Sequence, residues 1–135
     1  MNRKLVLDTN VFVAAGFRRG SASHELVQRA RHGDFVVVWT EATRRETRAV
    51  LRRIPPLDWD AVADLFRPEG EREGGDPAAV RAVPDPTDRK FAALARAAAC
   101  PLVSSDDDLR SCPPIEGLDV VSPSQALRRL DDASP

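Results

Sequence analysis

The feature that most constrains the fold is a run of five consecutive apolar residues, Phe35 to Trp39 (FVVVW). Its β-branched residues favour a strand, and the absence of alternating polar residues is typical of a strand covered on both faces. Strands of this kind belong to parallel sheets that are packed between helices. A second short apolar run, Lys4 to Leu7 (KLVL), stops at Asp8-Thr9-Asn10 and also predicts a buried strand.

The rest of the chain alternates between helical and strand patterns. Helices are predicted over 24–31 after a Ser23 cap, over 41–53 after a Thr40 cap, over 58–66, over 88–99, and from Ser122-Pro123 onward, where Gln125 completes a capping pattern. Further strands are predicted over 101–104 and 119–121. Strands that alternate with helices imply an α/β fold with a mainly parallel central sheet and helices on both faces.

A chain of 135 residues, 42% of them hydrophobic, is long enough to form one domain with a real core. We expect this domain to span 1–130, followed by a short C-terminal tail, 131–135. Segment 68–84 holds three of the seven glycines, three prolines and many charges, and we interpret it as a surface excursion rather than a second domain. Val80 and Val83 could add a short edge strand there.

Charge and cysteine usage limit the location and the partners. The formal net charge of −1 gives no global attraction to nucleic acids, although local surface charge still matters. The two cysteines, Cys100 and Cys112, match no metal-binding or redox spacing, which is typical of a reduced cytoplasmic protein. The start of the chain lacks a signal-peptide pattern, and no apolar run approaches the roughly 20 residues of a membrane helix. We therefore expect a soluble cytoplasmic protein with no membrane partner.

Three acids fall where α/β proteins build their sites. Asp8 ends the first strand, Asp106 follows strand 101–104, and Asp88 starts the helix just before that strand. Ligands bind beyond the carboxyl ends of the strands in open α/β sheets. Glu46 lies in mid-helix on the same side as the small residues Ala42, Thr43, Ala49 and Val50. A separate stripe is formed by Arg44, Arg48 and Arg52, and a solvated acid would be expected there. The position of Glu46 on the inward-leaning side therefore indicates a specific role.

Each acid also has a structural interpretation. Asp8 could be a turn residue at a strand end, and Glu46 could pair with arginines on its own helix. Asp85 and Asp88 could cap a helix or occupy its first turn, and residues 106–108 could form a solvated acidic turn. Convergence on one sheet edge favours a site, because clustered carboxylates repel each other unless cations bind among them.

The ligand types indicate the kind of metal. Hard oxygen ligands without nearby Cys or His favour Mg²⁺ or Mn²⁺ over zinc. Such an ion lowers the pKa of a bound water and neutralises charge on a phosphodiester in transition. Two ions would clamp the attacking and leaving oxygens, whereas one would activate water alone, and the sequence leaves the number open.

Four blocks of the sequence, in this order and at these spacings, resemble the PIN domain family. They are Leu7-Asp8-Thr9-Asn10-Val11, Glu46, Asp85-Pro86-Thr87-Asp88-Arg89-Lys90-Phe91, and Leu102-Val103-Ser104-Ser105-Asp106-Asp107-Asp108-Leu109. The resemblance covers Lys4 to about Leu130 and is nearest to the bacterial VapC-related toxins of toxin–antitoxin pairs. It implies a three-layer α/β/α sandwich with a mainly parallel sheet, and cleavage of single-stranded or structured RNA.

The same resemblance assigns roles to individual residues. The acids that would bind Mg²⁺ or Mn²⁺ and carry catalysis are Asp8, Glu46, Asp88 and Asp106. Asn10 would orient the first carboxylate, Ser104 keeps the hydroxyl of the Thr found in many relatives, and Asp108 would be an auxiliary acid near a second metal position. Asp85 is either a helix cap or an auxiliary acid. The stretch 69–76 departs most from the family pattern, so the resemblance does not predict where the substrate enters.

Three functions are compatible with this pattern. The first is a metal-dependent endoribonuclease, the toxin of a toxin–antitoxin pair, with RNA as substrate and a small antitoxin protein as partner. The second is an RNA-maturation nuclease without an antitoxin, and the third is a PIN-like module that has lost catalysis and binds RNA or protein. A haloacid-dehalogenase-type phosphatase needs a second Asp two positions after Asp8, where this chain has Asn10. The sequence does not decide whether the protein forms a homodimer. The arginine stripe is interpreted as a solvated face, with contact to RNA phosphates as the alternative.

Overall fold

The computed structural model describes residues 3–132, with the side chain of Asp108 left out. Four parallel strands form a sheet in the order β2-β1-β3-β4, with β1 at Lys4–Leu7, β2 at Val36–Val37, β3 at Leu102–Val103 and β4 at Val120–Val121. In register, Lys4 aligns with Val36, Val6 with Leu102, and Leu102 with Val120. The predicted parallel α/β sheet is confirmed, although every strand except β1 is shorter than expected.

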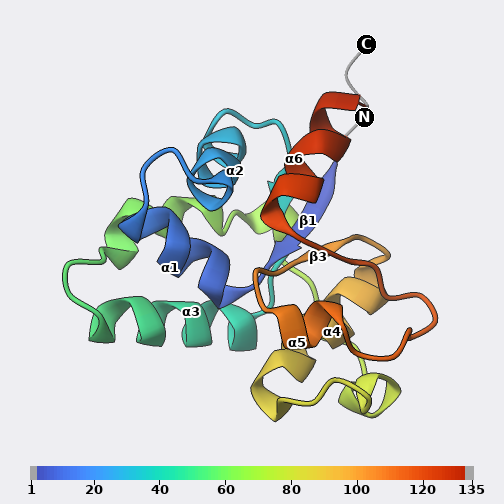
Figure 1. Cartoon of the computed structure of the whole chain (residues 1–135). Coiled ribbons are helices and arrows are strands. Elements are labelled where there is room, and N and C mark those ends of the chain that lie inside the picture. Colours follow the sequence, from blue (N-terminus) through green and yellow to red (C-terminus); the bar gives the residue numbers. More distant parts are fainter. Residues whose placement is uncertain (1–2, 133–135) are drawn as a thin grey trace.

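Helices cover both faces of this sheet (Figure 1). The α-helices of the described residues are α1 Thr9–Phe17, α2 Ala22–Arg31, α3 Glu41–Arg53, α4 Pro86–Ala98, α5 Asp107–Arg110 and α6 Pro123–Asp132. Side chains alternate along β1: Leu5 and Leu7 pack with α1, α2 and α6, whereas Val6 packs with α4 on the other face. This two-sided core confirms the three-layer arrangement. Within residues 3–132, no helix is both long and apolar enough to cross a membrane.

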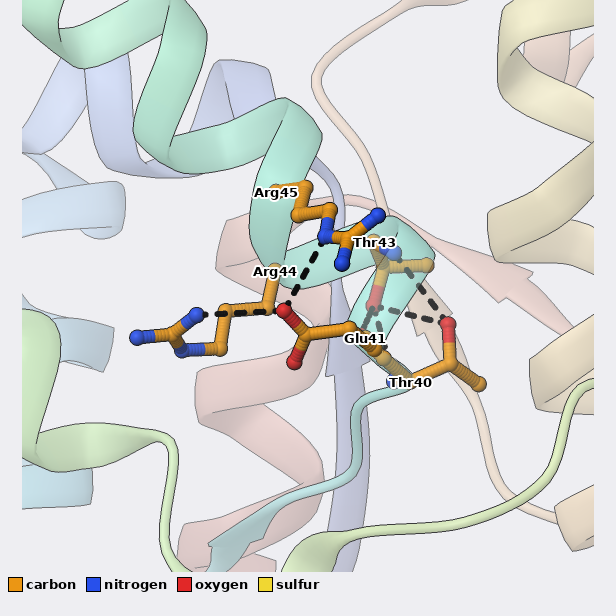
Figure 2. Close-up of polar contacts among 5 residues, drawn as sticks. All are labelled: Thr40, Glu41, Thr43, Arg44 and Arg45. Atoms are coloured by element: carbon orange, nitrogen blue, oxygen red, sulfur yellow. Dashed lines mark hydrogen bonds and ion pairs between the residues drawn. The ribbon is translucent and has the colours of Figure 1, made fainter.

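Helix α3 begins as its sequence predicts. Thr40 Oγ1 accepts a hydrogen bond from the Thr43 amide (3.1 Å), and the Thr40 amide donates to Thr43 Oγ1 (2.9 Å), which closes a capping box (Figure 2). On the solvent side of this turn, Glu41 accepts hydrogen bonds from Arg44 and Arg45. The Arg44 guanidinium also lies 5.6 Å from the centroid of the Trp59 ring. This member of the arginine stripe therefore helps to fasten α3 to the segment that follows it.

Two other helix starts can be compared with their predictions. Helix α6 begins as expected, because the Gln125 amide donates to Ser122 Oγ (3.1 Å) and the Ser122 amide donates to Gln125 Oε1 (2.8 Å). It continues through Asp132, two residues past the predicted domain end, and residues 133–135 lie outside the described part of the chain. The predicted Ser23 cap of α2 is wrong. Ser21 is the cap, its Oγ accepting from the His24 amide (3.1 Å), while Ser23 is buried inside the helix.

The sequence between α3 and α4 departs most from its predictions. The single helix expected over 58–66 is two short 3-10 helices, Trp59–Ala61 and Ala63–Leu65, with Asp58 capping the first. The break falls at Val62 (φ −122°, ψ −5°), and Phe66 beyond it packs against three other aromatic rings, those of Phe12, Trp39 and Trp59.

Helix α1 is not predicted from the sequence. Its segment, TNVFVAAGF, is apolar on nearly every side, so no polar face reveals the helical period. The helix buries Val11, Phe12 and Ala15, and Phe17 at its end is 53% exposed. Helix α1 leaves directly from Asp8, so it shapes one wall of the sheet edge where the acids lie.

Segment 68–84 is anchored in the core at three points. The edge strand expected at Val80 and Val83 is wrong, because a 3-10 helix, Pro77–Val80, turns both side chains into the α4 side of the core, where each is 0% exposed. A second 3-10 helix, Pro68–Gly70, lies against β2, and a parallel bridge joins Trp39 to Glu71. The remainder of the segment is mostly exposed, as expected of a surface excursion, except that Gly75 packs against α4, where a Cβ would stand 2.5 Å from the Ala93 carbonyl oxygen.

Replacing Gly70 with Ala should destabilise the fold through backbone overlap. A Cβ there would stand 1.9 Å from the Val37 carbonyl oxygen, an atom that is fixed in the sheet. We expect unfolding free energy to fall by roughly 2–3 kcal/mol, the range of overpacking substitutions. The matched control is Gly74→Ala, whose Cβ would meet only Thr40 Cγ2 at 3.7 Å. Equal melting temperatures for the two variants would contradict this packing.

Candidate active site

The carboxyl ends of β1 and β3 lie side by side and carry two polar side chains of the predicted site. The Asp8 amide donates to the Val103 carbonyl (3.0 Å), which places Asp8 beside Ser104. The Ser104 hydroxyl donates to Asp8 Oδ2 (2.8 Å), and the Asp106 amide donates to Ser104 Oγ (3.0 Å). Ser104, which is 0% exposed, therefore ties Asp8 to the segment that carries Asp106.

Asp8 is a buried carboxylate in a polar setting. Burial raises its pKa above the usual value, hydrogen bonds from Ser104 and from the Asn10 backbone lower it, and the nearby Asp106 raises it. The Asn10 side chain is exposed, and its backbone is the part that acts on Asp8. A role for the Asn10 side chain in orienting Asp8 stays a prediction.

Asp88 shows that the acids lie within reach of one another electrostatically. It sits in the first turn of α4 and is half-buried. Burial, followed by the negative charges of four other acids, raises its pKa to about 7; those acids are Asp8, Asp85, Asp106 and Glu46. The sheet edge thus gathers carboxylates from segments up to 98 positions apart, since Asp8 and Asp106 both act on Asp88.

Asp85 caps α4. Its Oδ1 accepts hydrogen bonds from the Thr87 amide (3.0 Å) and the Thr87 hydroxyl (2.5 Å), and these bonds lower the pKa of the exposed Asp85 carboxyl. Of the two roles left open for this residue, the structure displays the cap. Helix α4 consequently begins at Pro86, two residues before the predicted start at Asp88.

Glu46 faces α4 across the site. The buried side of α3 carries Thr43, Thr47 and Leu51. The predicted line of small inward residues is therefore confirmed at Thr43 and wrong at Ala42 and Ala49, which are exposed. Glu46 lies at the edge of the buried side with 21% of its side chain exposed. Its partner is not an arginine one turn away on α3, because Lys90 Nζ on α4 lies 2.6 Å from Glu46 Oε1.

The remaining acids follow β3. Asp106 is half-buried and precedes α5, and Asp107 is exposed and pairs with Arg110. Asp108, the predicted auxiliary acid, lies outside the residues whose side chains the structure describes. Residues 106–108 are therefore not one uniform solvated turn, since Asp106 acts on both Asp8 and Asp88.

Comparison with known families decides what this arrangement belongs to. The sequence model described as "PIN domain" matches residues 4–108, which is most of the chain. The chain belongs to the PIN domain family. PIN domains are generally nucleases, so a nuclease-type function is the coarse assignment that the family supports.

Solved structures agree with this PIN domain in fold. The crystal structure of PAE2754 from Pyrobaculum aerophilum is similar with a TM-score of 0.59 and 16% sequence identity, covering 97% of this chain and 98% of that chain. At this identity the likeness shows the fold alone. No curated protein sequence matches the chain significantly.

Two contacts around the site of this PIN domain are missed by sequence reasoning. The Thr9 and Thr47 hydroxyl oxygens lie 3.0 Å apart in the core, joining the residue after Asp8 to the residue after Glu46. The second is the Lys90–Glu46 pair. Thr47 could have been found as a member of the Thr43–Thr47 repeat on α3, whereas nothing local to Lys90 indicates a partner 44 positions away.

The chemistry of the donor set fits a hard divalent cation. The side chains that converge are carboxylates, the ligands that Mg²⁺ and Mn²⁺ prefer, and their mutual repulsion at Asp88 is what a cation would relieve. Among the described residues, no three His, Cys, Asp or Glu side chains already stand as a closed metal-binding group.

Proposed function

We propose that this PIN domain is a metal-dependent endoribonuclease that hydrolyses RNA phosphodiesters. The observation that carries the proposal is the electrostatic effect of the other acids on Asp88, at the sheet edge where α/β proteins bind ligands. The residues assigned to metal binding and catalysis are Asp8, Glu46, Asp88 and Asp106. A bound Mg²⁺ or Mn²⁺ supplies an activated water and neutralises charge on the phosphodiester.

The chain's own residues prepare the site for this role. Ser104 fixes one oxygen of Asp8, and backbone hydrogen bonds from Thr9 and Asn10 also hold this carboxylate. The same serine holds the backbone of Asp106, so one hydroxyl sets the relation of two candidate ligands. Asp85 caps α4 and thereby fixes the first turn, on which Asp88 lies.

The direct test is cleavage of RNA by the purified protein. We expect cleavage in Mg²⁺ or Mn²⁺ that stops with excess chelator and returns when the ion is restored. Undiminished cleavage in excess EDTA would sink the metal-dependent proposal. RNA binding without cleavage at any tested ion would favour the catalytically inactive PIN-like module.

We also propose that the protein is the toxin of a toxin–antitoxin pair. The support is the resemblance of the sequence to VapC-related toxins, together with an acidic site that already binds one side-chain cation, since Lys90 pairs with Glu46. An Arg or Lys of a small antitoxin could fill the remaining acidic position, because a cation relieves the same repulsion.

Growth measurements separate the toxin from an RNA-maturation nuclease. Expression of the wild-type protein alone should slow growth, Asp106→Asn should remove the effect, and co-expression of an adjacent small gene should restore growth. If wild type and Asp106→Asn grow identically and there is no adjacent small gene, the maturation nuclease is the better proposal.

A further inference from the structure

The ion pair between Lys90 and Glu46 crosses the site. Lys90 Nζ lies 2.6 Å from Glu46 Oε1, and the two side chains are 34% and 21% exposed. The pair joins α4 to α3, two helices that approach the carboxyl end of the sheet from different sides. An exposed ion pair contributes little to stability, but this pair is half-buried and holds an acid of the proposed site.

Glu46 is held from two directions. On its own helix, the neighbouring Thr47 hydroxyl lies 3.0 Å from the Thr9 hydroxyl, which ties α3 to the start of α1 beside Asp8. From the opposite side, the Lys90 ammonium engages the carboxylate itself. The other cation next to Asp88 points elsewhere, because Arg89 Nε donates to the Val83 carbonyl (2.9 Å).

The balance of charge follows from these contacts. When all four proposed acids are ionised they carry four negative charges, and Lys90 offsets one of them at Glu46. A single divalent ion offsets two more. Against these four acids, two divalent ions together with Lys90 would bring five positive charges, before any phosphate is bound. Asp85, the fifth acid around Asp88, is engaged by Thr87 as the α4 cap and is left out of this count.

We propose that Lys90 is a positioning residue whose ammonium holds Glu46 and supplies the positive charge that a second divalent cation would otherwise supply. The site then takes one Mg²⁺ or Mn²⁺, held by Asp8, Asp88 and Asp106. Glu46, which the proposed function counts among the metal-binding acids, serves instead as the partner of Lys90. This inference rests on the proposed metal-dependent function and specifies the number of ions, which the sequence leaves open.

The test is a titration with Mn²⁺, followed by the electron paramagnetic resonance signal of the free ion and by calorimetry. The wild type should bind one Mn²⁺ per chain. Lys90→Met keeps the apolar stem and removes the charge, so Mn²⁺ should bind roughly tenfold more tightly or a second ion should appear. Lys90→Arg should behave as the wild type. The matched control is Lys4→Met, which removes the only other lysine, an exposed residue at the far end of β1.

Each outcome decides between the inference and its alternatives. Two ions in the wild type overturn it, whether or not the variants fold. So does a Lys90→Met protein that is folded by circular dichroism yet binds Mn²⁺ with unchanged or weaker affinity, because Lys90 is then a structural ion pair only. The proposed function fails in a distinguishable way, with neither Mn²⁺ binding nor metal-dependent cleavage in the wild type.

Discussion

Replacing Asp8 with Asn is expected to reduce RNA cleavage by roughly a thousandfold or more, about 4 kcal/mol in activation free energy. Asn keeps the shape of the side chain and an oxygen that can accept the Ser104 hydrogen bond, but it loses the charge that a divalent cation requires. Because Asp8 is buried with a raised pKa, loss of its charge should leave the fold intact. Single-turnover cleavage rates, with circular dichroism on the same samples, measure both effects.

The matched control for this experiment is Asp131→Asn. Asp131 is an exposed acid near the end of α6 and pairs with Arg29. This end of α6 lies beside the start of β1, away from the site, because Arg3 donates to the Leu130 carbonyl. Its cleavage rate should equal that of the wild type. A folded Asp8→Asn protein that cleaves at the wild-type rate would mean that catalysis does not depend on this carboxylate.

Local signals in the sequence predict the frame of the site. The apolar run at β1, the Thr40 cap and the Ser122–Gln125 cap depend on residues within a few positions of each other, so each is visible in one stretch of sequence. The position of Asp8 at the end of β1 follows from the same pattern. Helix α1 is not predicted, because a helix without a polar face shows no helical period in its pattern of hydrophobic residues.

Contacts between distant segments are what the sequence does not reveal. The partner of Glu46 was expected on α3 or at a metal, but the Lys90 ammonium reaches it from α4. The Thr9–Thr47 contact is equally remote, spanning 38 positions. Val80 and Val83 have the β-branched pattern of a strand, yet their burial against α4 is satisfied by a short 3-10 turn. In each case tertiary packing decides between local alternatives that the sequence leaves equally open.

Replacing Asp88 with Asn should raise the melting temperature of the metal-free protein at pH 8. The Asp88 carboxyl has a pKa of about 7 against the usual 3.8, because burial and four neighbouring acids disfavour its charge. The folded protein therefore holds this proton more tightly than the unfolded chain does. Its stabilising effect is fully present below about pH 4 and is lost as the pH rises through 7. Asn carries no charge to lose.

The size of the effect at pH 8 is roughly 1–2 kcal/mol after screening of a half-exposed group by solvent, or several degrees in a domain of this length. The advantage of Asp88→Asn over wild type should shrink steadily as the pH is lowered from 8 to 4. Asp85, not Asp88, caps α4, so the variant keeps its helix cap and loses only a favourable first-turn charge. Thermal unfolding at a series of pH values in EDTA measures this dependence.

The response to added metal should differ between the two proteins in the opposite sense. At a hundred times its dissociation constant, Mn²⁺ should stabilise the wild type by about 2.7 kcal/mol, whereas Asp88→Asn should gain much less because a ligand is missing. Asp85→Ala is the contrasting variant: it removes the α4 cap, so its melting temperature should fall without metal. If Asp88→Asn instead melts below the wild type in EDTA and keeps the full response to Mn²⁺, then Asp88 is a structural residue of α4. The repulsion among these acids would then not mark a cation site.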